Sequence, residues 1–140
     1  MNKIIVLYGA ASIGKSTVLR LVHSELKMMS SGWIDGMQKK GVDLRDVFII
    51  KGRKVGIETE GDPGGRLEKS LSEFRREGCE IIVCASRTRG GTVEIVERMK
   101  PNYHLSWRGQ SNVSDLGQRK LSNCAICELI INEVRHALHA

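Results

Sequence analysis

The segment Gly9-Ala10-Ala11-Ser12-Ile13-Gly14-Lys15-Ser16 joins an apolar run to a helical pattern near the start of the chain. The run before it, residues 3–8, is almost continuously hydrophobic, as is typical of a strand buried on both faces. After it, Val18, Val22 and Met29 recur at helical spacing, which predicts a helix over about residues 15–29. The two glycines of the segment therefore mark a turn from a strand into a helix.

The spacing Gly-x-x-x-x-Gly-Lys-Ser matches the P-loop, or Walker A, pattern. Glycines let successive backbone N–H groups point at phosphate oxygens, and the helix N-terminus adds partial positive charge. Lys15 can reach the β- and γ-phosphates, and the Ser16 hydroxyl can bind Mg²⁺. An ordinary glycine-rich turn would leave Lys15 and Ser16 unexplained. We therefore expect a nucleoside triphosphate with Mg²⁺ to bind at Gly9, Ala10, Ala11, Ser12, Ile13, Gly14, Lys15, Ser16 and Thr17.

Three carboxylates, Glu58, Glu60 and Asp62, stand close together after a strand that we expect beside the phosphate loop. A carboxylate there can complete the shell of a magnesium ion or orient the attacking water. We select Glu58 and Asp62 as metal ligands and, with Lys15, as catalytic residues, although the sequence does not separate them from Glu60. The alternative is a solvated acidic turn in which Asp62 only caps the following helix.

The rest of the chain alternates strands with helices. Residues 47–51 and 54–59 predict a hairpin, and Asp62-Pro63 predicts a helix start. Further strands are predicted over 80–85 and 103–107, and residues 32–46 have no clear period. This pattern predicts one α/β domain over residues 1–140, with a mostly parallel sheet of about five strands, helices on both faces and one antiparallel hairpin strand.

These features resemble the P-loop NTPase superfamily, which implies a three-layer sandwich and NTP hydrolysis. More loosely, Val47 to Ala85 resembles the switch region of Ras-like GTPases. Their Asp-x-x-Gly turn is approximated by Glu58-Thr59-Glu60-Gly61 and by Asp62-Pro63-Gly64-Gly65. The guanine-reading segment Asn-Lys-x-Asp does not occur in the chain. ATP is therefore the default nucleotide.

Two functions follow from this resemblance. The first is an NTPase whose hydrolysis switches or drives a protein partner, which suits a short chain with little room for an acceptor pocket. The alternative is a small-molecule or nucleotide kinase. Arg87, Arg89 and Arg108 follow predicted strands and could hold an acceptor phosphate, and residues 30–46 could supply a lid.

The composition sets further bounds. Of the 140 residues, 41% are hydrophobic and 27% charged, as in ordinary globular domains. No apolar run approaches the roughly 20 residues of a membrane helix, and the first residues read as a strand rather than a signal peptide. We therefore expect a cytoplasmic protein with no membrane contact. The net charge of +6 admits nucleic acid as a partner, but short basic runs and 4% aromatic residues do not favour it.

The spacing of Cys124 and Cys127 is that of a zinc knuckle. However, Cys84 lies within an apolar run and Cys127 on the apolar stripe of the last predicted helix. We therefore expect buried thiols and no zinc.

Overall fold

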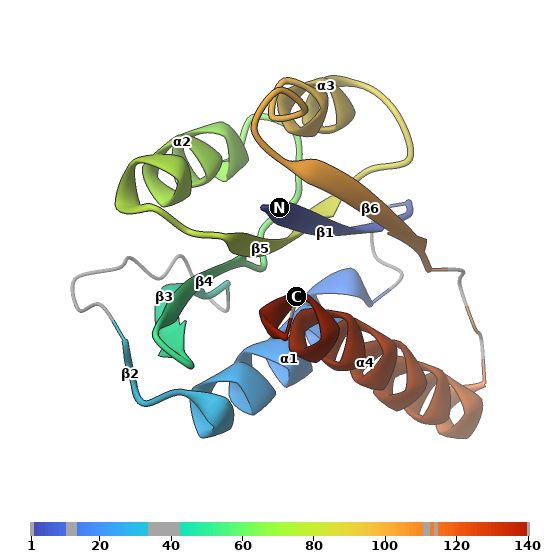
Figure 1. The fold of residues 1–140 in the computed structure, drawn as a ribbon. Coiled ribbons are helices and arrows are strands. Elements are labelled where there is room, and N and C mark those ends of the chain that lie inside the picture. Colours follow the sequence, from blue (N-terminus) through green and yellow to red (C-terminus); the bar gives the residue numbers. More distant parts are fainter. Residues whose placement is uncertain (1, 11–13, 34–42, 111–112, 114, 140) are drawn as a thin grey trace.

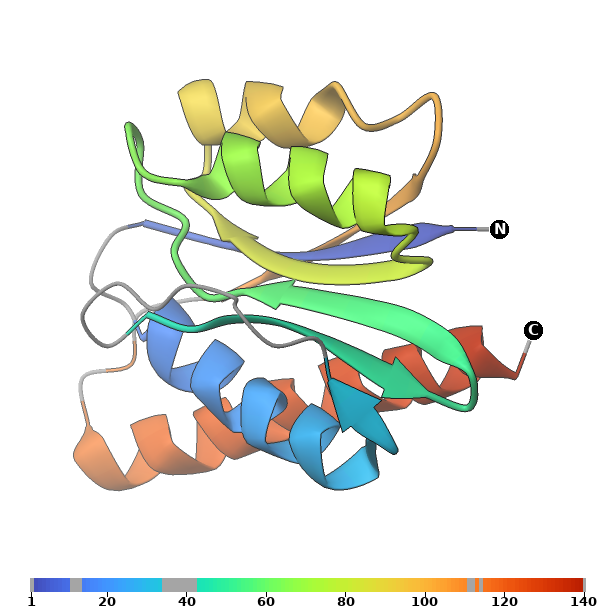
Figure 2. The same cartoon turned by 90° about the vertical axis from the view of Figure 1, so that its left-hand side faces the viewer.

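The computed structural model describes residues 2–10, 14–33, 43–110, 113 and 115–139. These residues form one sheet between two layers of helices (Figures 1 and 2). The sheet has six strands in the order β2-β3-β4-β5-β1-β6. The predicted α/β architecture, with a mostly parallel sheet covered on both faces, is confirmed.

The centre of the sheet is parallel. Strand β1 (Lys3–Tyr8) pairs with β5 (Ile81–Ser86) on one side and with β6 (His104–Gly109) on the other. Strand β4 (Arg53–Glu58) lies on the far side of β5. Every residue of β5 is buried, which agrees with the apolar run that precedes Ser86. Strand β5 therefore separates β4 from β1, whereas we had expected β4 beside the phosphate loop.

Strand β3 (Arg45–Ile50) forms the predicted antiparallel hairpin with β4. Lys51 and Gly52 in the turn both have positive φ, 52° and 74°, which suits the twist of a tight hairpin. A sixth strand, β2 (Gly32–Trp33), pairs antiparallel with β3 inside the segment for which the sequence shows no period. Two residues are too few for an alternating pattern. Residues 34–42 of that predicted connection and lid lie outside the described part, and its last two residues, Arg45 and Asp46, belong to β3.

The helices divide between the two faces of the sheet. Helices α1 (Lys15–Met29) and α4 (Leu116–Leu138) cover one face, and α2 (Leu67–Glu77) and α3 (Gly91–Glu97) cover the other (Figure 2). Each face has its own buried apolar cluster. The bounds of α1 agree with those predicted from its apolar spacing. None of the helices in the described part is long and apolar enough to cross a bilayer.

Helix α2 begins later than predicted. The sequence places Asp62 as its N-cap, but the helix starts at Leu67, and its N-cap, Arg66, makes no side-chain cap. The Asp62 carboxylate instead accepts from Arg87. The predicted helix end is confirmed at Gly78, whose φ of 86° is the left-handed conformation that glycine tolerates.

Candidate functional site

A polar cavity of about 450 Å³ lies where the N-terminus of α1 meets the chain that follows β4. Both the loop after β1 and the turn after β4 leave the carboxyl ends of their strands. Ligands bind at such ends in open α/β sheets. The cavity is lined by Gly14, Lys15, Ser16, Thr17, Asp43, Thr59, Glu60, Gly61, Asp62, Ala85, Arg119 and Asn123.

The first wall of the cavity is the start of α1. Gly14 is its N-cap, with a φ of 95° that favours glycine, and it offers no side chain to the first N–H groups of the helix. Uncapped N–H groups and the helix dipole together favour an anion at this point. Of the predicted loop residues, Ala11, Ser12 and Ile13 lie outside the described residues. Gly14, Lys15, Ser16 and Thr17 all reach the cavity.

Lys15 turns its ammonium group back onto the loop. Its Nζ atom donates to the carbonyl oxygens of Gly9 at 2.7 Å and Ala10 at 2.6 Å. Only 8% of the residue is exposed. Burial lowers the pKa of Lys15 below its usual value, the charge of Arg87 lowers it further, and Asp62 opposes both effects. The ammonium group of Lys15 is thus held by neutral carbonyl oxygens. The charged oxygens of a polyanion can replace these carbonyls as its hydrogen-bond partners.

The acidic turn reaches α1 by passing over the end of β5. At the crossing, a Cβ atom on Gly61 would lie 2.6 Å from the carbonyl carbon and oxygen of Ala85. No side chain fits there, so glycine permits the close approach of the two backbones. The turn after β4 therefore joins the cavity although β5 separates β4 from β1.

Glu58 lies outside the cavity. It is completely buried, and both its oxygens accept from Arg66, at 2.7 Å from Nε and 3.1 Å from Nη2. Ser70 and the backbone N–H of Glu60 also donate to it. Burial alone would lower the pKa of Arg66, but the hydrogen bond and charge of Glu58 raise it above the usual value. This placement favours a structural role for Glu58 over the metal-binding role expected from the sequence.

Glu60 and Asp62 line the cavity itself, as does Asp43. Asp43 accepts from the hydroxyl of Thr59 at 3.1 Å, which fixes it beside the acidic turn. The Glu60 side chain is 7% exposed, whereas the Asp62 side chain is 70% exposed. Asp43 stands before β3, and no motif in the sequence singles it out. Three carboxylates thus line the same cavity as Lys15 and Ser16.

The three arginines proposed for an acceptor phosphate have different surroundings. Arg87 donates to Oδ1 of Asp62 at 3.1 Å, next to the cavity. Arg108 pairs with Glu133 of α4 at 2.9 Å. Arg89 is exposed on the loop after β5. Arg87 is therefore the arginine of the three that the structure brings near Lys15.

The third wall of the cavity comes from α4, in which no motif of the sequence indicates a site residue. Asn123 is buried, and its Oδ1 atom accepts from Nε2 of Gln110 at 3.2 Å. Arg119 lies one helical turn earlier and donates from Nε to the carbonyl oxygen of Val113 at 2.8 Å. A polar residue on the buried stripe of a helix was the signal that could have identified Asn123.

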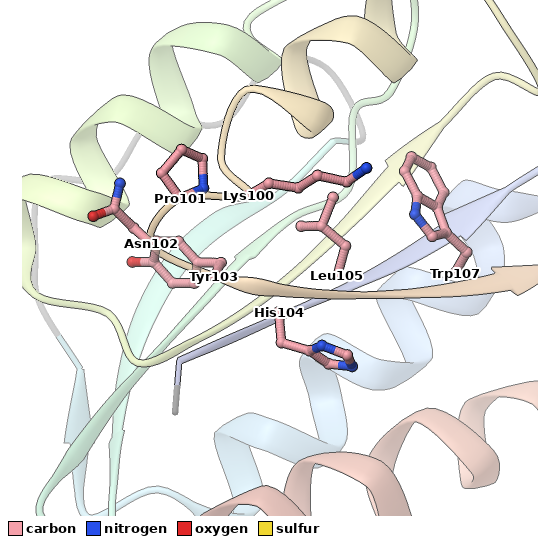
Figure 3. Close-up of a pocket in the computed structure, with 7 residues that line it drawn as sticks. All are labelled: Lys100, Pro101, Asn102, Tyr103, His104, Leu105 and Trp107. Atoms are coloured by element: carbon pink, nitrogen blue, oxygen red, sulfur yellow. The ribbon is translucent and has the colours of Figure 1, made fainter.

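A larger cavity, of about 610 Å³, lies along the edge strand β6 (Figure 3). It runs from Lys100 to Trp107, towards the opposite end of the sheet from Gly9, and has no carboxylate in its lining. Lys100 beside it pairs with Glu97 at 2.5 Å. The polar cavity at α1 is therefore the better candidate for a phosphate and metal site.

Two further observations limit what the site can be. Among the described residues, no three His, Cys, Asp or Glu side chains converge closely enough to hold a metal ion by themselves. Comparison of the chain with protein-family models, curated proteins and solved structures gives no match. The functional assignment therefore rests on the residues of this chain.

Proposed function

We propose that this protein binds a nucleoside triphosphate with Mg²⁺ at the cavity beside α1 and hydrolyses it as a nucleotide-dependent switch or partner-driving NTPase. The observation that carries the proposal is Lys15. It is a buried lysine of a Gly-x-x-x-x-Gly-Lys-Ser segment, it is held by backbone carbonyls, and it borders a cavity whose other wall is acidic. Its hydrogen-bond partners among the described residues are neutral carbonyls, and a buried ammonium in such surroundings is suited to receive an anion.

Binding would exchange the partners of Lys15. Phosphate oxygens would replace the carbonyl oxygens of Gly9 and Ala10, while the first N–H groups of α1 would donate to the same phosphates. Charge-assisted hydrogen bonds of this kind are stronger than those to neutral carbonyls. The expected contacts of Ala11, Ser12 and Ile13 remain part of the proposal.

The residues around the cavity fit magnesium. The ion prefers oxygen ligands, and it is usually held by one or two carboxylates together with phosphate and water rather than by a complete protein cage. Ser16, Glu60 and Asp62 offer such oxygens at one cavity. When bound, the ion would neutralise charge that develops on the phosphates. Glu58 is a weaker candidate because its oxygens already accept four hydrogen bonds.

Hydrolysis requires a water oriented towards the γ-phosphate, and a carboxylate can provide this. Asp62 is the more exposed of the two candidates, and Arg87 neutralises it. Glu60 is more enclosed. We assign water orientation to one of these two residues and phosphate binding to Lys15.

Phosphoryl transfer to a small acceptor is the second candidate function. It is favoured by Arg87, a cation next to the cavity with an exposed partner that an acceptor phosphate could displace. Arg108 supports it less because Glu133 already neutralises its charge.

Two measurements of phosphate release separate the two functions. One is made with Mg²⁺ and ATP alone, and the other is made after a panel of nucleosides is added. A switch NTPase releases phosphate with ATP alone. A kinase consumes ATP only when an acceptor is added, and transfers the label to it. Competition of ATP and GTP for a fluorescent analogue tests the base, and we expect ATP to compete at least as well as GTP.

A further inference from the structure

We propose that helix α4 supplies the nucleoside subsite of the cavity, with Arg119 packing its planar guanidinium on the base and Asn123 donating to it. This inference rests on the proposed nucleotide-binding function, and it assigns the base to a helix face instead of a strand-to-helix loop motif. The sequence offers no Asn-Lys-x-Asp segment for that task.

A chain of contacts ties this part of α4 to the phosphate loop. The backbone N–H of Gln110, just after β6, donates to the carbonyl oxygen of Tyr8 at the end of β1. Its side-chain Nε2 then donates to Oδ1 of Asn123. A Cβ atom on Gly14 would lie 3.4 Å from Nε2 of Gln110 and 3.8 Å from the amide atoms of Asn123. The amide pair therefore packs directly against the turn that opens α1.

The two ends of the cavity differ in charge. Asp43, Glu60 and Asp62 lie on the side of the acidic turn, whereas Arg119 and Asn123 come from α4. The start of α1 stands between the acidic turn and the first turns of α4 (Figure 2). A terminal phosphate with its metal belongs at the acidic end because the carboxylates there offer the oxygen ligands that a magnesium ion prefers. The nucleoside at the other end of the same ligand then lies against α4.

The chemistry of the α4 wall suits a purine. The Oδ1 atom of Asn123 accepts from Gln110, so its amide NH₂ is the group to offer a ligand. The Arg119 guanidinium is anchored through Nε to Val113, which leaves its flat face and terminal N–H groups for the base. The N7 atom of the purine ring is an acceptor in both adenine and guanine. This donor-rich wall therefore predicts weak discrimination between the two purines.

The test compares Mg·ATP with inorganic tripolyphosphate by titration calorimetry. Tripolyphosphate has the phosphates but no nucleoside, so it uses Lys15 and not the α4 wall. We expect Arg119→Ala to weaken ATP binding about tenfold or more and to leave tripolyphosphate binding within about twofold. Lys120→Ala, which removes an exposed cation from the next position of α4, should change neither ligand.

Arg119→Lys keeps the charge but not the planar group. We expect it to lose ATP affinity like the alanine variant, with a parent-like melting temperature. Full ATP affinity in this variant, equal losses of both ligands in Arg119→Ala, or no loss of ATP in Arg119→Ala would each overturn the nucleoside subsite. Binding of neither ligand by the parent protein would instead overturn the proposed function itself, and the subsite with it.

Discussion

Arg87 at the end of β5 donates to Asp62 of the acidic turn, with 3.1 Å between Nη2 and Oδ1. The pair lies beside Lys15, whose pKa both charges affect in opposite directions. Arg87, Asp62 and Lys15 thus each have an internal partner, since Lys15 donates to two loop carbonyls. A triphosphate and its metal would compete for these partners.

Removing Arg87 is expected to slow hydrolysis. If the guanidinium leaves Asp62 for the terminal phosphate, it stabilises charge that develops in the transition state. Arg87→Ala should then reduce kcat about tenfold or more, with a smaller change in KM. Steady-state phosphate release measures both constants. Arg89→Ala, on the same loop and exposed, is the matched control. Equal rates in parent and Arg87→Ala would mean that this arginine only neutralises Asp62.

Lys15→Ala should abolish most nucleotide binding and leave the fold intact. The variant loses the cation that spans the phosphates, so the affinity for Mg·ATP should fall at least about tenfold. Burial lowers the pKa of Lys15, which means that its charged form is disfavoured in the folded protein relative to the unfolded chain. The charged ammonium therefore lowers the free energy of unfolding at neutral pH. This effect is lost as the pH rises from the lowered pKa of Lys15 in the folded protein through the ordinary lysine pKa.

The melting temperature of Lys15→Ala at pH 7 should accordingly equal or exceed that of the parent. Calorimetry and thermal melting measure the two quantities, and Lys69→Ala, on exposed α2 surface, is the control. Unchanged ATP affinity with a normal melting curve would contradict the phosphate-loop proposal.

The cysteines should differ sharply in reactivity. Cys124 is exposed, whereas Cys79, Cys84 and Cys127 are buried. Burial raises the pKa of Cys79 to about 12 and that of Cys127 to about 11, and it raises the pKa of the Cys84 thiol as well. Because the thiolate is the reactive form, one thiol should react quickly with a chromogenic disulfide at pH 7.5 in the native protein.

All four thiols should react after unfolding in guanidinium. The positions of Cys84 on β5 and Cys127 on the buried stripe of α4 agree with the sequence prediction. The absence of zinc stays a prediction. Elemental analysis of the purified protein that gives one zinc per chain would contradict it. Fast reaction of more than one thiol in the native protein would contradict the burial of the other three cysteines.

The sequence predicted those parts of the fold that repeat a regular pattern. The apolar run of β1 and the helical spacing after Lys15 are local signals, and the bounds of α1 followed from them. The start of α2 was missed because Asp62-Pro63 satisfies a helix start locally. A tertiary contact, the Arg87 ion pair, holds Asp62 instead. Strand order was equally inaccessible, since nothing in the pattern tells whether β4 or β5 lies beside β1.

The residues of the candidate site also differ in whether a local sequence pattern could identify them. The phosphate loop is contiguous in sequence, so its residues could be named. Asp43, Arg119 and Asn123 reach the cavity from segments far apart in the chain. Glu58 and Glu60 are two positions apart, yet only Glu60 lines the cavity, because Arg66 and Ser70 of the following segment hold Glu58. Spacing alone could not show this difference.

Gly61→Ala tests the crossing of the acidic turn over β5. The added methyl group would meet the backbone of Ala85 at 2.6 Å, and a backbone cannot move as a flexible side chain can. Overpacking of this kind costs about 1–3 kcal/mol of unfolding free energy. The turn should also shift away from the cavity, so nucleotide hydrolysis should fall. Urea unfolding and phosphate release measure the two effects. Gly64→Ser is a poor control because of its positive φ, whereas Gly91→Ala adds a methyl group in open space at the start of α3. A Gly61→Ala protein with parent stability and activity would contradict the close crossing.

The carboxamide series Glu58→Gln, Glu60→Gln and Asp62→Asn separates structure from catalysis within the acidic segment. Glu58→Gln removes the charge that accepts both hydrogen bonds from Arg66, which leaves the largely buried guanidinium with the more distant Glu60, 3.8 Å from its Nε atom, as a counter-ion. Breaking a buried pair in this way costs about 3–5 kcal/mol, so this variant should melt well below the parent. Asp62→Asn changes an exposed side chain, and its surface ion pair is worth at most about 1 kcal/mol. It should therefore keep close to the parent stability.

Because Glu60 and Asp62 line the cavity, at least one of these two variants should lose about tenfold or more in kcat, equivalent to about 1.4 kcal/mol of barrier, with a smaller change in nucleotide affinity. Melting temperature and phosphate release measured side by side distinguish the two classes. If Glu60→Gln and Asp62→Asn both hydrolyse ATP at the parent rate, the acidic turn provides neither the metal ligand nor the water-orienting group. If Glu58→Gln melts like the parent and loses only turnover, the buried network with Arg66 is not structural, and the metal-binding role expected from the sequence returns to Glu58.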